Sequence, residues 1–331
     1  MIVTDYFRPT RDLTWDYALQ CGVTHGVVRL PEAADFDPAD RSHWRTVVDR
    51  FRAAGIRPLV VEPLPNALHD HIKLGDARRD ECLEKALAMF PIMEEFGFTT
   101  LCANFMAAIG WTRTRQDLPD RGGALVTGFD EAEFRAPEGT PEVSEAQLWD
   151  NLAVFLRAAV PVAERHGIRI ALHPDDPPLP RLGPVARILR SADAFERAWS
   201  LAPSPFLGAT FCQATFAMMG EDVHSLVPRW KDRIFFVHFR NARGTASRFR
   251  ETFHDDGQLD MARLVRLYET HLPADVPVRV DHVPAMGAAD ARDGYGATGR
   301  LFALGYLKGL LQGAEEGRGR GAELKFPRRL P

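Results

Sequence analysis

Eight short apolar runs alternate with helical patterns along this chain of 331 residues. Several runs are apolar throughout, which is typical of parallel strands that are buried on both faces. The predicted strands span Ile2–Tyr6, Gly26–Leu30, Arg57–Leu64, Thr99–Phe105, Arg169–His173, Leu207–Cys212, Ile234–Arg240 and Val278–His282. Eight β-α units predict an α/β fold in which the parallel sheet closes into a single (β/α)8 TIM barrel.

The helical patterns between these runs carry recognisable ends. Asp40 stands where it would cap a helix that ends before Gly55, and Ser144 with Gln147 forms a capping-box pattern. The predicted helices span Thr14–Cys21, Asp40–Ala54, Arg79–Phe96, Ser144–His166, Ser191–Leu201, Asp222–Trp230, Asp260–His271 and Ala297–Leu311. The structural alternative is an open, doubly wound sheet. No GxGxxG sequence follows any predicted strand, which disfavours the dinucleotide-binding form of that alternative.

One segment interrupts the alternation of predicted strands and helices. Residues 112–143 follow the fourth strand and are rich in Gly, Pro and charged residues, and ALVTGF after a Gly-Gly pair predicts one arm of a hairpin. A long insertion after a barrel strand lies at the catalytic face, so it is either a lid over the site or a surface excursion. We expect a barrel domain over residues 1–311 with this lid-like insertion, and an extended or poorly ordered polar tail over 312–331.

Composition and charge exclude several classes of protein. With 41 basic and 45 acidic residues the net charge is −4, which favours neither a nucleic acid nor an anionic membrane as partner. No apolar stretch reaches the roughly 20 residues that a membrane span needs, and the N-terminal sequence lacks the pattern of a signal peptide. We therefore expect a cytoplasmic protein. Its four cysteines are scattered without a CxxC motif, and free thiols are expected.

Residues of metal-ligand type close the apolar runs of the last four predicted strands: His173, Cys212, His238 and Asp281. Taken singly, each is more often a structural residue or a helix cap than a ligand. Because they follow consecutive strands, barrel geometry brings them to one side of one rim. Two imidazoles, a thiolate and a carboxylate suit a divalent transition metal, and these ligand types admit Zn²⁺, Fe²⁺ and Mn²⁺.

Further polar side chains crowd the same predicted rim. Arg240 follows His238, His282 follows Asp281, and the loops after the last two strands contain His254 and Tyr295. Glu62 and Asn104 stand at the ends of the third and fourth strands. An ordinary loop residue is the alternative for each of them. Because ionisable residues at this face of a barrel are disproportionately catalytic, a functional role is favoured for Arg240, His254, His282 and Tyr295.

Several segments together resemble those of a known family, the mannonate dehydratases, which are a metal-dependent branch of the xylose-isomerase-like barrels. The resemblance covers most of the chain, and HPDDPP, TFC and VHFRN in this order are its most specific parts. The matching segments are His71–Gly75, Asn104–Met106, Trp111–Thr114, His173–Pro178, Thr210–Cys212, Phe236–Asn241, the spaced residues Glu251, His254, Gly257, Asp260 and Met261, then Asp281–His282 and Gly294–Gly296.

The resemblance implies dehydration of D-mannonate to 2-keto-3-deoxy-D-gluconate, with Mn²⁺ or Fe²⁺ as cofactor and a homodimer as the assembly. It implies the same four metal ligands that the strand ends select, and it places His282 and Tyr295 at the acid and base positions without saying which is which. A base must take the C2 proton and an acid must protonate the C3 hydroxyl. The expected substrate contacts are Asn104, Trp111, Arg240 and His254, with Arg240 suited to the substrate carboxylate.

The chain departs from the family pattern beside the expected catalytic residues. The family usually continues Asp-His with Gly-Arg, whereas Val283 and Pro284 follow His282 here. Ala103, Ala107 and Arg250 also replace the residues that are common in the family at those positions. These changes leave the metal ligands in place and affect the substrate contacts. Two alternatives therefore stay open: a sugar or sugar-acid isomerase or epimerase, and a paralogue that binds a sugar acid without converting it.

Overall fold

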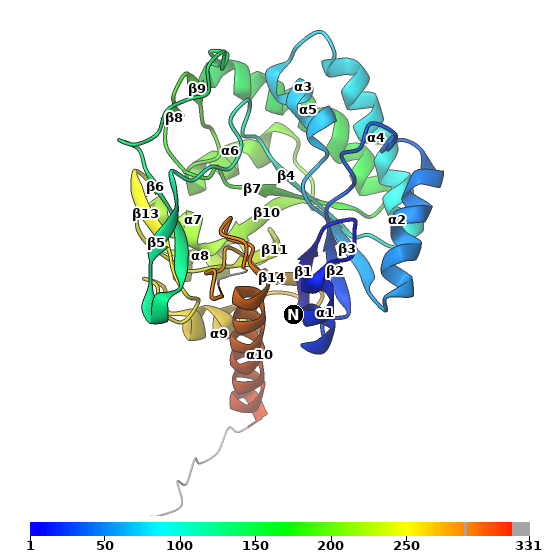
Figure 1. The fold of residues 1–331 in the computed structure, drawn as a ribbon. Helices are drawn as coiled ribbons and strands as arrows, with labels where there is room; N and C mark the ends of the chain where they lie inside the picture. Colours follow the sequence, from blue (N-terminus) through cyan, green and yellow to red (C-terminus); the bar gives the residue numbers. More distant parts are fainter. Residues whose placement is uncertain (288–289, 320–331) are drawn as a thin grey trace, which may run out of the picture.

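The computed structural model describes residues 1–287 and 290–319, and a closed barrel of eight parallel strands forms its centre (Figure 1). The barrel strands are β1 Ile2–Phe7, β2 His25–Val28, β3 Arg57–Val61, β4 Thr100–Asn104, β7 Arg169–His173, β10 Leu207–Cys212, β11 Ile234–Phe239 and β14 Pro277–Val280. Around the barrel their order is β1-β14-β11-β10-β7-β4-β3-β2, with β1 pairing to both β14 and β2. The predicted (β/α)8 barrel is thus confirmed.

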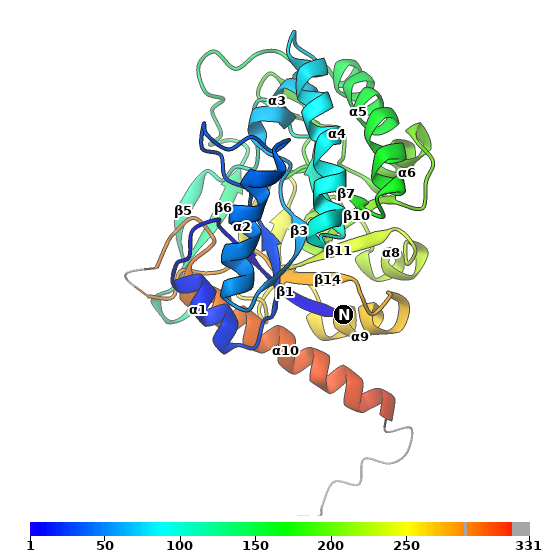
Figure 2. The ribbon, with the colours of Figure 1, turned by 90° about the vertical axis from the view of Figure 1, so that its right-hand side faces the viewer.

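Helices surround the barrel on its outside, as the two ribbon views show (Figure 1 and Figure 2). They are α1 Leu13–Gln20, α2 Arg41–Ala53, α3 Asn66–Leu74, α4 Arg79–Phe96, α5 Glu145–Arg165, α6 Ala192–Leu201, α7 Gln213–Met218, α8 Val223–Arg229, α9 Met261–His271 and α10 Ala297–Gly319. The predicted caps are present, since Asp40 accepts from the N–H of Ser42, and Ser144 forms a complete capping box with Gln147. The sequence did not predict α3 and α7.

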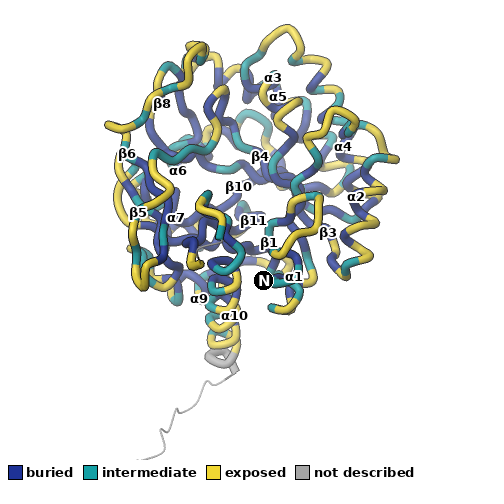
Figure 3. The backbone as a smooth tube through the Cα atoms, viewed as in Figure 1, coloured by how far each residue is buried: buried dark blue, intermediate teal, exposed yellow. Residues whose placement is uncertain are grey.

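The interior of the barrel explains why polar residues gather at one rim. An apolar cluster fills it, made of Val27, Leu59, Val60, Cys102, Ala171, Phe235 and Phe236. Side chains alternate along a strand, so a residue two positions further on faces the same side. His173 therefore follows Ala171 inward on β7, and His238 follows Phe236 on β11. Burial is deepest along these central strands (Figure 3).

Several strands end earlier than the sequence predicted. Strand β14 ends at Val280 and β11 at Phe239, so Asp281, His282 and Arg240 follow their strands and are not part of them. Strand β3 likewise ends at Val61, one residue before Glu62. These four candidate residues thus lie just beyond the ends of their strands, where the chain is free to change direction.

The insertion after β4 folds into a small antiparallel sheet. Its strands β5 Arg115–Pro119 and β6 Leu125–Asp130 form the predicted hairpin, joined by the 3-10 turn η1 Arg121–Gly123. Strand β6 also pairs with β13 Arg248–Glu251, which pairs with β12 Ala242–Thr245 from the loop after β11. Two loops far apart in the sequence therefore share one sheet. The lid-like role of the insertion stays a prediction.

The remaining elements are peripheral. A two-stranded ladder joins β8 Arg181–Leu182 to β9 Val185–Ala186. Helix α10 continues beyond Leu311, where we expected it to end, as far as Gly319, and it projects from the barrel (Figure 1). The rest of the predicted polar tail, residues 320–331, lies outside the described residues. Among the described residues, no helix has the length and apolar character needed to cross a bilayer.

Candidate metal centre and active site

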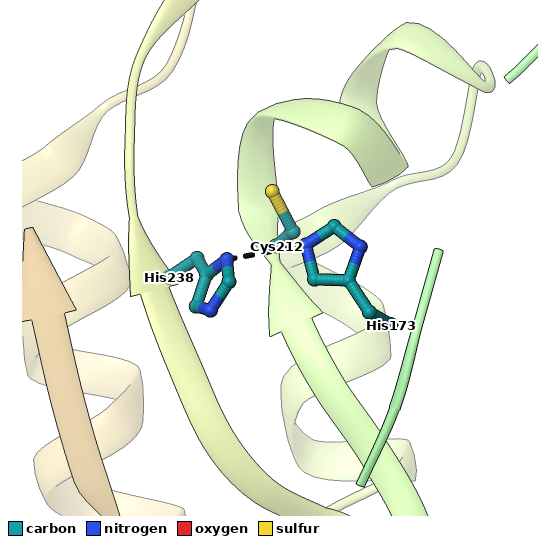
Figure 4. Close-up of side chains that lie close together, drawn as sticks. All are labelled: His173, Cys212 and His238. Atoms are coloured by element: carbon teal, nitrogen blue, oxygen red, sulfur yellow. Dashed lines mark hydrogen bonds between the residues drawn. The ribbon is translucent and has the colours of Figure 1, made fainter. Parts of the chain in front are cut away.

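Three of the four predicted metal ligands converge at the rim of the barrel. His173 ends β7, Cys212 ends β10, and His238 lies one residue before the end of β11. One ligand atom from each lies within 4.8 Å of those of the other two. The close-up shows the two imidazoles and the thiol around one point (Figure 4). Adjacent parallel strands thus present three ligand atoms at the spacing of a first coordination sphere.

The outer contacts of the two histidines decide which nitrogens face this point. His173 Nδ1 lies 2.7 Å from the carbonyl oxygen of Pro174, and a carbonyl only accepts, so Nδ1 carries the proton. The lone pair of His173 Nε2 then faces His238 Nδ1 at 3.2 Å. Two nitrogen lone pairs at this distance need a cation or a proton between them. Metal-binding histidines commonly have their other nitrogen held in this way.

The thiol of Cys212 is arranged to be a thiolate. Its Sγ lies 3.1 Å from Thr215 Oγ1 and 3.5 Å from Nη1 of Arg240. Burial raises the pKa of Cys212, but the charge of Arg240 and the proximity of His173 and His238 outweigh the effect of burial and lower that pKa to about 5. A thiolate is the form of cysteine that binds metals. The donor set therefore fits a divalent transition metal.

Asp281, the fourth predicted ligand, lies beside this group. Its Oδ2 is 3.5 Å from His238 Nδ1, the same nitrogen that faces the group. Its Oδ1 accepts from Arg279 Nη1 at 2.8 Å and from the hydroxyl of Tyr295 at 3.3 Å. Within the described part of the chain, the cluster of mutually close ligand atoms consists of His173, Cys212 and His238 and does not include Asp281. Its role as a ligand stays a prediction.

A buried ion pair between Glu62 and Arg279 holds Nε2 of His238, the ring nitrogen that points away from the ligand group. Glu62 Oε1 lies 3.1 Å from His238 Nε2, and Glu62 also accepts from Arg279 Nε at 2.8 Å and Nη2 at 3.0 Å. Arg279 Nε lies 3.2 Å from His238 Nε2 as well, but its short bond to Glu62 already uses its proton. His238 Nε2–H therefore donates to Glu62, which leaves Nδ1 to face the ligand group.

A second close group contains Glu62, Cys102 and His238. It suits a metal less well. Burial and the charge of Glu62 raise the pKa of Cys102 well above its usual value, so this side chain is a neutral thiol. Glu62 is bound in two places by Arg279. The group around His173 is consequently the better candidate for a metal centre.

Glu62→Gln is expected to lower the affinity for Mn²⁺ by about 10- to 100-fold, the usual effect of removing a carboxylate behind a metal-binding histidine. A neutral amide cannot form the two charged bonds to Arg279 and no longer fixes the ring of His238. Calorimetric titration of the metal-free protein with Mn²⁺ measures the effect. Glu95→Gln, at an exposed ion pair with Arg41, is the matched control. An unchanged dissociation constant in Glu62→Gln would show that Glu62 does not position His238.

The candidate active site is a cavity of about 170 Å³ beside these ligands. Its lining combines acids, bases and aromatic rings from loops after several strands. It is lined by Tyr6, Arg29, Glu62, Pro63, Cys102, Asn104, Met106, Trp111, His173, Arg279, Asp281, His282 and Tyr295. The predicted residues Asn104, Trp111, His282 and Tyr295 therefore share one cavity with two of the predicted metal ligands.

The backbone at His282 explains how two consecutive residues reach this cavity. His282 has φ 42°, in the left-handed region that residues other than Gly seldom adopt. The turn brings the side chains of both Asp281 and His282 to the cavity, although adjacent residues of a regular strand face opposite ways. Strain of this kind persists where the surrounding structure requires it, which is often at a functional site.

Aromatic neighbours fix the ring of His282. It stacks on Trp111 with ring centroids 4.9 Å apart and an interplanar angle of 17°, and the Tyr295 ring lies 5.2 Å away. Burial lowers the pKa of His282 to about 3, so the ring is neutral, and its buried Nδ1 has no hydrogen-bond partner. Burial raises the pKa of the Tyr295 phenol well above its usual value, and the negative charge of Asp281 adds to this. A neutral imidazole and a protonated phenol thus stand side by side.

Arg240 and His254, two predicted substrate contacts, do not line this cavity. Arg240 is fully buried and binds Glu251 through Nε at 2.8 Å and Asp176 through Nη1 at 2.7 Å. His254 Nε2 donates to the carbonyl oxygen of Phe239 at 2.8 Å, and burial lowers the pKa of His254 to about 4. This placement gives both residues partners within the protein and does not support direct contact with a substrate.

Some residues of the site escaped prediction from the sequence. Arg279 stands two positions before Asp281 and so faces the same side of its strand, a signal that the alternation could have given. Arg113, in the insertion, binds Asp176 at 2.8 Å and Glu251 at 2.7 Å. Its segment, Trp111–Thr114, is part of the family resemblance, but the sequence does not indicate the partners of Arg113, because both lie far away along the chain.

Solved structures share the barrel fold of this chain. A xylose isomerase domain protein from Planctomyces limnophilus matches with a TM-score of 0.60 and 13% identity, covering 95% of this chain and 98% of that one. At this identity the similarity concerns the fold alone. Mannonate dehydratase from Streptococcus suis serotype 2 is far more similar, with a TM-score of 0.85 and 26% identity over 100% of this chain and 99% of that structure.

Sequence comparison identifies the family. The family model described as D-mannonate dehydratase (UxuA) matches residues 3–140 and 137–320. Mannonate dehydratase from Streptococcus agalactiae is 30% identical over 310 residues, which cover 84% of this chain and 87% of that protein. Mannonate dehydratase 2 from Halalkalibacterium halodurans is 29% identical and covers 92% and 96%. The chain belongs to the D-mannonate dehydratase family and is an enzyme of the hydro-lyase class.

Proposed function

We propose that this enzyme dehydrates a sugar acid in a metal-dependent reaction, with D-mannonate converted to 2-keto-3-deoxy-D-gluconate. The convergence of His173, Cys212 and His238 beside a cavity that also contains His282 and Tyr295 carries the proposal. The family relationship supports the reaction class, and the names of the relatives suggest D-mannonate as the substrate.

We propose that His173, Cys212 and His238, with Asp281 beside them, hold Mn²⁺ or Fe²⁺. The ligand types also admit Zn²⁺. When bound, the metal supplies a Lewis acid that stabilises negative charge developing on the substrate carboxylate. The thiolate of Cys212 and the carboxylate of Asp281 bring negative charge to the site, while the two imidazoles contribute neutral lone pairs. Such a set binds a divalent cation with little excess charge.

His282 and Tyr295 move the protons. One of them removes the proton from C2, and the other protonates the hydroxyl on C3, which leaves as water. The resulting enol rearranges to the 2-keto acid, so the substrate loses one molecule of water in total. Stacking against Trp111 orients the imidazole of His282 during these steps. Asn104 has its Oδ1 bound by the N–H of Met106, which leaves its amide N–H groups for the sugar hydroxyls.

Removing the metal is expected to abolish keto-acid formation, and adding Mn²⁺ or Fe²⁺ is expected to restore it. The assay incubates the chelated and reloaded enzyme with a panel of hexonates and pentonates and measures the 2-keto-3-deoxy product. The melting temperature gives an independent readout, because a ligand at about 100 times its Kd stabilises the folded state by about 2.7 kcal/mol. Absence of keto acid from every sugar acid, with the metal bound, would overturn the proposal.

The same panel separates the alternatives. An isomerase or epimerase would give a rearranged sugar or sugar acid without loss of water, and a non-catalytic paralogue would bind a sugar acid unchanged. Homodimer formation and a cytoplasmic location remain predictions from the sequence. Light scattering of the purified protein tests the dimer directly.

A further inference from the structure

Arg29 occupies the wall of the cavity opposite the candidate metal centre. It directly follows β2, and it lines the same cavity as His173. In the closed order of the barrel, β2 lies four strands from β10 in either direction. Strand β10 carries Cys212, the middle member of the ligand group on β7, β10 and β11. A substrate that reaches the metal with one end therefore directs its other end toward Arg29.

Arg29 is also the cavity-lining arginine that is available to a ligand. Arg279 lines the cavity too, but it is buried and bound to Glu62 and Asp281. The side chain of Arg29 is 37% exposed and pairs with Glu32, itself 40% exposed, at 2.8 Å. Exposed pairs of this kind contribute little stability, so a substrate anion can replace Glu32 at small cost. The guanidinium presents planar donors that match a carboxylate or a phosphate.

The space around Arg29 and the departure from the family pattern support this assignment. Arg29 forms part of a second hollow, of about 490 Å³, whose lining also includes Arg8, Arg11, Asp12 and Glu32. A group bulkier than a hydroxyl thus has room beside the guanidinium. At the other side of the cavity, Val283 and Pro284 follow His282 where the family usually has Gly-Arg. The arginine that usually follows the Asp-His pair in the family is thus replaced here by Pro284, while Arg29 provides a cation at the far end of the cavity.

We propose that the preferred substrate carries a second anionic group at the end remote from the metal, bound by Arg29. This inference rests on the proposed dehydration and names its substrate class. The reacting part keeps the carboxylate at C1 and the hydroxyls at C2 and C3, while C6 bears a carboxylate or a phosphate. Both groups would form the same charge-assisted hydrogen bonds with the guanidinium.

The test compares three substrates with the metal-loaded enzyme: D-mannonate, its analogue with a carboxylate at C6, and its 6-phosphate. We expect kcat/KM for one or both dianionic acids to exceed that for D-mannonate by about 10- to 100-fold, the effect of one charged hydrogen-bond partner. The better of the two identifies the distal group. Arg29→Gln should remove this preference, because it should raise KM for the dianionic acid much more than KM for D-mannonate.

Glu32→Gln should act in the opposite direction, because it removes the internal competitor for Arg29 and so should lower KM for the dianionic acid. Arg41→Gln, at an exposed arginine paired with Glu95, is the matched control. It should change kcat/KM for neither D-mannonate nor the dianionic acid. A preference for D-mannonate, or a dianion preference that survives Arg29→Gln, would overturn the inference. In either case keto-acid formation would leave the proposed dehydration standing.

Failure of the proposed dehydration would give a different experimental result. No sugar acid would then give keto acid, and calorimetry with the unreacted acids would decide the role of Arg29. Binding of the dianionic acid that is tighter than that of D-mannonate, and that weakens in Arg29→Gln, would still support the anion site. Equal affinity of the wild type and of Arg29→Gln for the dianionic acid would overturn the anion site.

Discussion

His282→Asn is expected to lower kcat by about 10²- to 10⁴-fold, the usual contribution of a general acid or base. The imidazole lines the cavity and is stacked on Trp111 beside Tyr295. Asparagine keeps the polarity and tolerates the left-handed backbone at this position, where φ is 42°, so the fold should persist. Rates of keto-acid formation at saturating substrate measure the change.

Metal content separates catalysis from binding in this variant. If His282 moves a proton, the affinity for Mn²⁺ should stay within about threefold of the wild type, since a loss of tenfold or more marks a residue of the metal centre. His166→Asn, at the histidine that caps the C-terminus of α5 and contacts Glu94, is the matched control and should leave kcat unchanged. A kcat close to that of the wild type in His282→Asn would remove His282 from the mechanism and would leave Tyr295 as the remaining candidate.

Arg240→Met is expected to lower the free energy of unfolding by about 3–5 kcal/mol, the cost of breaking a buried ion pair by removing one partner. Two arginines and two carboxylates form a closed network here. Arg240 and Arg113 each bind both Asp176 and Glu251, and all four side chains are at most 1% exposed. Loss of one guanidinium leaves two buried carboxylates facing a single positive charge. Urea denaturation measures the change.

An exposed pair provides the comparison for Arg240→Met. Arg229 binds Glu196 at 2.6 Å with side chains 51% and 41% exposed, and Arg229→Met should cost at most about 1 kcal/mol. A substrate-binding role for Arg240, as the sequence predicted, would instead raise KM and leave stability close to that of the wild type. Equal destabilisation by the two substitutions would contradict the structural role of Arg240.

The barrel and its candidate metal-binding rim could be predicted because both depend on local patterns. Apolar runs define the strands, and residues of metal-ligand type stand at or near the ends of these runs, as at His173, Cys212 and His238. The exact strand ends could not be predicted, because they depend on pairing with neighbours. Strand β11 stops at Phe239, and the chain then turns so that Arg240 meets Asp176 and Glu251.

The partners of buried charges were equally beyond the reach of the sequence. Arg279 pairs with Glu62 from the other half of the chain, and Arg113 pairs with residues that follow β7 and form β13. Charges of this kind look like ordinary surface residues in a one-dimensional reading. Only the closure of the barrel brings them together, and burial then requires that they be paired.

The sheet shared by the insertion and the loop after β11 limits how this enzyme can change. In many barrels each loop at the catalytic face varies separately, so that new specificities arise one loop at a time. Here β6 pairs with β13, and Arg113 ties the insertion to the segments around Asp176 and Glu251. A transplant of one loop alone would break a strand pairing and a buried ion network together. These segments therefore form one structural module, and protein engineers should exchange them together.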